Sequence, residues 1–153
     1  MPNWTFNNLK MKGLRKEDLF TEEGEFDFDK IIPEPRKIED CPEEFNLDKH
    51  PAPVQKLEDR PWFNWYDWRV ENWGTKWCAG ETFFCKDGSI SFQTAWAPPL
   101  PVILELSKRY PERVIKFSYY DEDYHGHNYL TIQNGEMVSY CNRLKKEFML
   151  FDD

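Results

Sequence analysis

The sequence predicts an α+β fold in which an antiparallel β-sheet carries helices on one face. Short runs of alternating apolar and polar residues indicate strands, and apolar residues at helical spacing indicate two helices. Asp87-Gly88 and Asn134-Gly135 are typical of tight hairpin turns. The chain has 153 residues, of which 17% are aromatic, so we expect one domain with a bulky core, spanning residues 1–153.

Six segments have the composition of strands, and a seventh is apolar and extended. Residues 14–20 carry a helical pattern too short to be stable alone. Residues 26–32 are expected to be extended, with Pro33 ending them. The expected strands are residues 3–12, 77–84, 89–96, 114–120, 129–132 and 137–141.

Two segments have the end signals of helices. In the first, Asn64 can cap the start and Gly74 can take the left-handed position at the end. The second carries an apolar stripe over residues 100–110, with Pro101 in its first turn and Pro111 after its end. We expect both helices to lie on one face of the sheet.

A long loop separates the N-terminal elements from the first helix. Residues 33–61 are charged, contain six prolines and have few large apolar side chains. Such an insertion is either a functional surface or a mobile segment. Residues 142–153 form a tail beyond the last strand.

The chain is acidic, with 20 basic and 28 acidic residues and a net charge of −8. This charge disfavours nucleic-acid binding unless the cations cluster. The acidic residues either keep the protein soluble or form a face for a basic partner. The candidate partner-binding carboxylates are Glu22, Glu23, Glu25, Asp27, Asp29, Glu43, Glu44, Asp121, Glu122 and Asp123.

The cellular compartment follows from hydropathy and cysteine usage. The mean hydropathy is −0.80, and neither a membrane span nor a signal peptide is recognisable, so we expect a cytoplasmic protein. The four cysteines form no C-x-x-C pair, which gives little support to a zinc site. We expect free, mostly buried thiols.

Residues 61–77 hold the densest aromatic cluster, and two interpretations stay open. The rings could stack on a nucleotide or on single-stranded nucleic acid, with cations on the phosphates. They could equally form the core between the first helix and the sheet, which the number of tryptophans favours. The candidate ligand-binding residues are Trp65, Trp68, Arg69, Trp73 and Lys76.

Catalytic motifs are weak. Residues 121–127 contain three carboxylates and two imidazoles, which could bind a divalent metal in a hydrolase, although a polar loop is the simpler interpretation. Neither a G-x-S-x-G motif nor a Gly-rich phosphate loop is present. We therefore expect no metal, no cofactor and no catalytic residue.

Several segments together resemble the YubB-like family of phage and plasmid proteins. The similar segments are MPNW at residues 1–4, FDFDKIIP at 26–33, WYDWRVENWGTKW at 65–77 and FQTAWAPP at 92–99. The resemblance implies a ferredoxin-like domain carried by a mobile element. It implies no catalytic residue.

This setting suggests a function by association. Small accessory genes of mobile elements often encode inhibitors of host defence, including anti-CRISPR proteins. The leading hypothesis is therefore a non-enzymatic inhibitor whose acidic surface occupies a host defence protein, such as a nucleic-acid-handling complex. The alternative from the residues is a nucleotide or single-strand binder built on the tryptophan cluster, and the third is the metal-dependent hydrolase.

Overall fold

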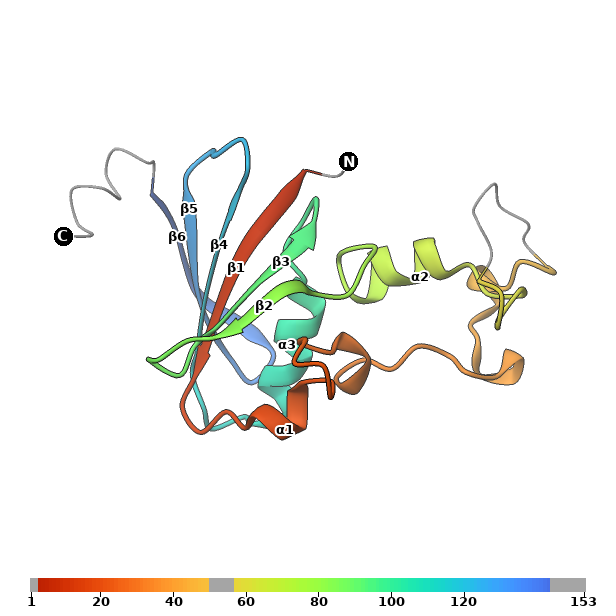
Figure 1. Cartoon of the computed structure of the whole chain (residues 1–153), viewed down its shortest axis with the longest axis horizontal. Coiled ribbons are helices and arrows are strands. Elements are labelled where there is room, and N and C mark those ends of the chain that lie inside the picture. Colours follow the sequence, from red (N-terminus) through yellow and green to blue (C-terminus); the bar gives the residue numbers. More distant parts are fainter. Residues whose placement is uncertain (1–2, 50–56, 144–153) are drawn as a thin grey trace.

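The protein is built on a six-stranded antiparallel sheet with the strand order β2-β3-β1-β4-β5-β6 (Figure 1). The computed structural model describes residues 3–49 and 57–143. The α+β class expected from the sequence is confirmed. The strands are β1 (Trp4–Met11), β2 (Gly80–Phe84), β3 (Ile90–Ala95), β4 (Ile115–Asp121), β5 (His127–Gln133) and β6 (Glu136–Arg143).

Both expected hairpin turns form where the sequence places them. Asp87 accepts a hydrogen bond from the Ser89 amide, and Gly88 takes a φ of +87° between β2 and β3. Asn134 and Gly135 have φ values of +50° and +77° between β5 and β6, the left-handed pair that a two-residue hairpin requires. Local turn chemistry thus fixes the register of both hairpins.

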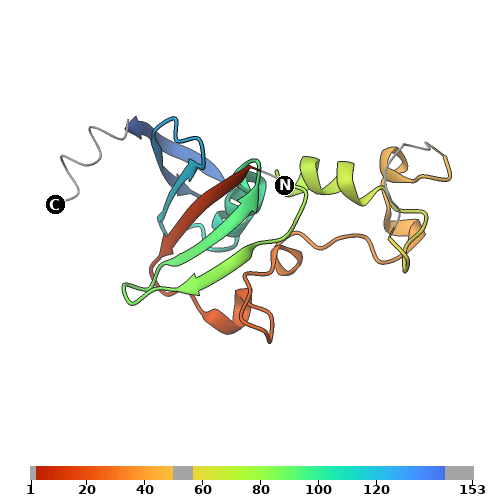
Figure 2. The ribbon, with the colours of Figure 1, turned by 45° about the horizontal axis from the view of Figure 1, so that its top comes forward.

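Helices cover one face of the sheet and leave the other open (Figures 1 and 2). The helix α3 (Leu100–Arg109) buries Val102, Ile103 and Leu106 against the strands. The short helix α1 (Lys16–Leu19) buries Leu19 near the end of this face. Among the described residues, no helix has the length and apolar character needed to cross a membrane.

The expectation that residues 26–32 are extended is wrong. The 3-10 helix η1 (Phe28–Lys30) forms there, because the Asp27 side chain accepts a hydrogen bond from the Asp29 amide and caps the turn. This turn buries Phe26 and Phe28, whose rings pack edge-to-face against Phe92 of β3. These apolar residues therefore pack into the core from a turn and do not form a seventh strand.

Residues 33–49 and 57–72 form an arm that projects from the side of the sheet (Figure 1). The arm holds η2 (Ile38–Asp40), η3 (Glu43–Phe45) and the helix α2 (Trp65–Asn72), and residues 50–56 of the expected loop lie outside the described residues. Asn64 caps α2 by accepting from the Asp67 amide, as the sequence predicts. The helix α2 therefore lies in the arm rather than over the sheet.

Candidate functional site

The open face of the sheet presents side chains that alternate with the core residues. On β1, Thr5, Leu9 and Met11 are buried, whereas Phe6 and Lys10 lie on the other side. Because side chains alternate along a strand, the same rule assigns every second residue of the neighbouring strands to this open face. Phe6, Asn8 and Lys10, which alternate along β1, are among the residues that line its two hollows.

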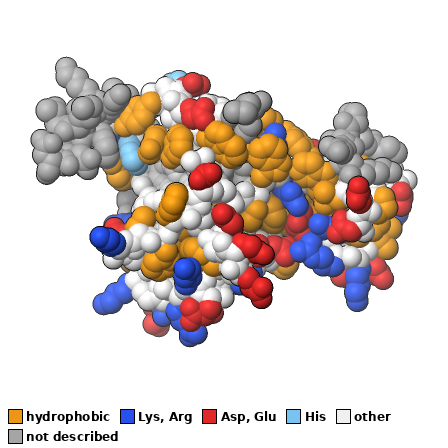
Figure 3. All heavy atoms as spheres, viewed as in Figure 1, with side chains coloured by type: hydrophobic (Ala, Val, Ile, Leu, Met, Phe, Trp, Pro, Cys, Tyr) orange, Lys and Arg blue, Asp and Glu red, His pale blue; other side chains and the backbone are white. Residues whose placement is uncertain are grey.

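An aromatic row crosses the open face and consists of Phe6, Tyr120, His127 and Tyr129. Phe6 stacks on Tyr120 at a ring-centroid distance of 5.1 Å, Tyr120 lies 5.0 Å from His127, and His127 stacks on Tyr129 at 4.7 Å. The pairing of Phe6 with Tyr120 in the β1–β4 register joins residues far apart in the sequence. Figure 3 shows hydrophobic side chains in a line across this part of the molecule, with a histidine at one end.

Next to the aromatic row, a basic hollow of about 460 Å³ opens on the same face. Its cations are Lys10, Lys116 and Arg143, and none of the described residues that line it is acidic. Lys116 donates to the Thr131 hydroxyl at 3.0 Å, and the Arg143 guanidinium lies 5.5 Å from the Tyr129 ring centroid. The remaining lining residues are Asn8, Phe117, Ser118, Tyr129, Leu130, Ser139 and Cys141.

A Trp–Lys–Trp sandwich, formed by Lys76, Trp77 and Trp96, lies where α2 meets the sheet. The Lys76 ammonium is 4.2 Å from the ring centroid of Trp77 and 4.0 Å from that of Trp96. Trp77 in turn lies 6.1 Å from Trp4 of β1. Lysine over the face of tryptophan is a favourable cation–π arrangement.

The tryptophan cluster predicted to bind a ligand serves mainly as structure. Trp68 and Trp73 are buried, and Trp73 donates its indole N–H to the Ile32 carbonyl at 2.9 Å. The hypothesis that bases stack on these two rings is therefore wrong, because protein covers the ring faces. Trp65 is half-buried and lies over the Arg69 guanidinium.

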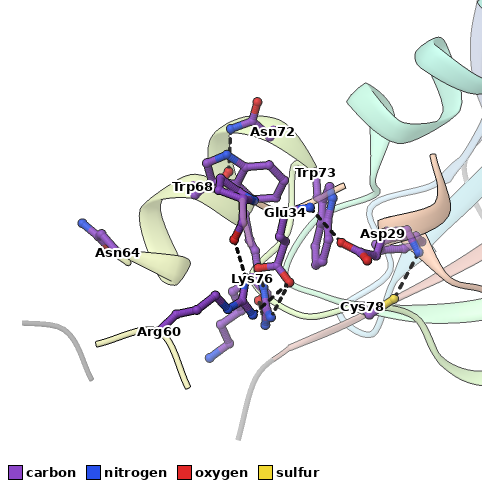
Figure 4. A network of polar contacts seen from close by, with 12 residues as sticks. Asp29, Glu34, Arg60, Asn64, Trp68, Asn72, Trp73, Lys76 and Cys78 are labelled. Atoms are coloured by element: carbon purple, nitrogen blue, oxygen red, sulfur yellow. Dashed lines mark hydrogen bonds and ion pairs between the residues drawn. The ribbon is translucent and has the colours of Figure 1, made fainter. Parts of the chain in front are cut away.

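Arg69 is held by the buried carboxylate of Glu34, which Figure 4 shows within a network of polar contacts, and so is not available for a phosphate. Its Nε donates to Glu34 at 2.8 Å and its Nη2 donates to the same carboxylate at 3.0 Å. Arg60 lies 3.7 Å from Glu34 and donates to the Pro35 carbonyl. Of the five predicted ligand-binding residues, Lys76 keeps a partly exposed cationic group in an aromatic setting.

The predicted acidic contact region is divided among three places. Asp27 caps η1, Asp29 pairs with Arg36, and Asp121 accepts from the Thr5 hydroxyl at 3.0 Å. Several of these carboxylates therefore have structural partners within the fold. The exposed members lie in the turn after α1 (Glu22, Glu23), in the arm (Glu43, Glu44) and after β4 (Glu122, Asp123), and Glu25 is partly buried.

The candidate metal ligands of residues 121–127 do not converge with others. His127 belongs to the aromatic row and His125 is exposed in the β4–β5 turn. Within the described ranges, no group of three or more His, Cys, Asp or Glu side chains could hold a metal ion. The four cysteines are free, with Cys141 exposed and the other three partly buried, so the thiols are more accessible than expected.

An antiparallel sheet with helices on one face places the protein in the α+β class, to which ferredoxin-like domains belong. Residues 72–148 match the family model described as the ferredoxin-like domain in Api92-like protein. The match covers half of the chain, and the chain therefore belongs to this family. The expected membership of the YubB-like family is wrong, and the phage or plasmid setting inferred from it loses its basis.

Among solved structures, protein Api92 from Yersinia pseudotuberculosis is similar, with 18% sequence identity and a TM-score of 0.44. The similar region covers 50% of this chain and 29% of that chain, so this chain corresponds to less than a third of that protein. No curated protein matches this sequence.

Proposed function

We propose that the open face of the sheet is a non-enzymatic binding site for single-stranded nucleic acid. The aromatic row takes unpaired bases, and the basic hollow beside it takes the phosphates. The observation that carries the proposal is the continuous series of ring contacts from Phe6 to Tyr129, on the face that none of the described helices covers.

The geometry of the rings suits stacking. Each ring of the aromatic row is partly exposed and contacts its neighbours in the row, so its orientation is fixed before a ligand binds. Base–aromatic stacking contributes about 1–3 kcal/mol per base and tolerates any base, since every base has a π-face. Two or three stacked bases would together contribute about 2–9 kcal/mol without sequence preference, and contacts to the phosphates would add to this.

The charge of the hollow supports a ligand that carries phosphate. In a chain with a net charge of −8, three cations without a carboxylate among the described lining residues are a local exception. Ser118, Thr131 and Ser139 add hydroxyl donors to the same wall. The hollow thus offers both charge and hydrogen bonds to a phosphodiester.

Docking to a protein through the acidic residues is less well supported by the geometry. The exposed carboxylates belong to three separate parts of the chain, and several of the others have partners within the fold. One partner would have to contact the turn after α1, the arm and the β4–β5 turn together. The open face offers one continuous surface instead.

Fluorescence anisotropy with a labelled single-stranded 12-mer at low salt tests the proposal. Tyr129→Ala removes a ring of the row and should weaken binding about tenfold. Tyr140→Ala is the matched control, because Tyr140 belongs to the same hairpin and pairs opposite Leu130, on the other side of the sheet. This control should leave the affinity unchanged.

Two results would contradict the proposal. One is the absence of 12-mer binding by the unaltered protein at low salt. The other is an equal loss of affinity in Tyr129→Ala and Tyr140→Ala, which would mean that the ring on the open face has no special part in binding.

A further inference from the structure

We infer that the Trp–Lys–Trp sandwich is a second stacking subsite for the same strand. A bound single strand would then continue from the aromatic row past Trp4, at the start of β1, and over the end of β3 toward the base of the arm. This inference rests on the proposed function and adds the path and the length of the site.

A shared strand face and a ring contact connect the two subsites. Trp4 and Phe6 are two residues apart on β1 and so share the open face. Trp4 contacts Trp77 at a centroid distance of 6.1 Å, and Trp77 shares the Lys76 ammonium with Trp96. The aromatic surface therefore runs from β5 across β4 and β1 to the segments that follow α2 and β3.

The backbone of Trp96 is held in a conformation that burial does not explain. Its φ is +69°, which a bulky side chain rarely adopts, and its side chain is 49% exposed. Hydrogen bonds on both sides maintain this geometry: the Trp96 amide donates to the Asn3 carbonyl, and the Thr94 hydroxyl donates to the Ala97 carbonyl. Strain of this kind, kept to hold an exposed ring, is typical of binding sites.

The sandwich combines the two features that a nucleic-acid strand needs. Trp77 and Trp96 are both exposed by more than a third and can each offer a ring to a base. Lys76 is fixed between them, so its ammonium is placed for a phosphate before the ligand arrives. A cation that is already ordered loses little freedom on binding.

Oligonucleotide length separates this inference from the proposed function. A 4-mer can occupy the aromatic row alone, whereas a 12-mer can reach both subsites. Trp96→Gly should lower the 12-mer affinity about tenfold and leave the 4-mer affinity unchanged. Because glycine adopts a positive φ without strain, the thermal midpoint should stay the same or rise.

Two further variants complete the design. Asn134→Gly is the matched control, since Asn134 also has a positive φ and is exposed, but it lies in the β5–β6 turn. It should change neither affinity. Lys76→Met keeps the length of the side chain without its charge, and should weaken 12-mer binding alone even if Trp96→Gly folds poorly.

The outcomes are distinguishable. If the unaltered protein binds both oligonucleotides and neither variant weakens the 12-mer, the second subsite is refuted while the proposed function stands. Equal losses for both lengths would also refute it. If the unaltered protein binds neither oligonucleotide, the proposed function and this inference fall together.

Discussion

Cys78 and Cys141 differ in how deeply their thiols are buried. Cys78 is enclosed between η1 and the sheet, where its sulfur accepts from the Phe28 amide at 3.3 Å. Burial raises the pKa of the Cys78 thiol to about 11. Cys141 is exposed on β6, at the wall of the basic hollow.

These environments predict different thiol reactivities. At pH 8, about a thousandth of Cys78 is thiolate, which is the reactive form, and its surroundings block reagents as well. A disulfide reagent such as Ellman's should therefore label Cys141 in a fast phase and Cys78 only after unfolding. Cys141→Ser should lower the amplitude of the fast phase by one thiol, since Cys41 and Cys85 are also partly exposed, and fast labelling of Cys78 in the folded protein would contradict its burial.

At the scale of elements, the arm depends on one carboxylate. The Glu34 side chain is 5% exposed and is shared by Arg69 at its base and Arg60 farther along the arm. This buried ion-pair network becomes destabilising when one partner is removed, because the remaining charge is then buried without compensation.

Removal of Glu34 should therefore destabilise the protein. Glu34→Ala leaves the largely buried Arg69 guanidinium without a carboxylate and Arg60 with only the exposed Asp59, and should lower the free energy of unfolding by about 3–5 kcal/mol. Glu39→Ala, an exposed carboxylate of the same arm, should change it by less than about 0.5 kcal/mol. Urea denaturation measures both, and equal effects would mean that the pair with Arg69 adds nothing.

Elements with strong local signals could be predicted from the sequence, and those set by packing could not. The hairpin turns at Gly88 and Gly135, the cap at Asn64 and the helix after Pro99 each depend on a few neighbouring residues. The alternation of Phe26 and Phe28 looked like a strand, because a buried turn and a buried strand share the same composition. Only the side-chain cap of Asp27 distinguishes them.

The candidate site depends on the arrangement of the whole chain. The density of tryptophans points to residues 61–77, yet the rings of the aromatic row come from β1 and from β4 and β5, and more than a hundred residues separate β1 from the other two strands. The strand order places β1 beside β4 and so brings Phe6 onto Tyr120. No local pattern carries this information, because non-local pairing decides which aromatic residues meet.

The net charge of the whole molecule sets how binding should respond to salt. Overall repulsion from phosphates is screened by salt, whereas contacts in the basic hollow release counterions from the strand. Each phosphate contacted by a cation changes the slope of log affinity against log salt by about −0.7 for a single strand. Lys10, Lys116 and Arg143 together should give a 4-mer a slope of roughly −2.

Lys116→Gln tests this number of phosphate contacts in the same salt titration. It should reduce the magnitude of the slope by about 0.7 and weaken binding most at low salt. Lys49→Gln is the matched control, since Lys49 is exposed in the arm and pairs with Glu43 at 3.7 Å. A flat salt response of the unaltered protein would exclude phosphate contacts in the hollow, and an equal change in both variants would show that the hollow is not where the phosphates bind.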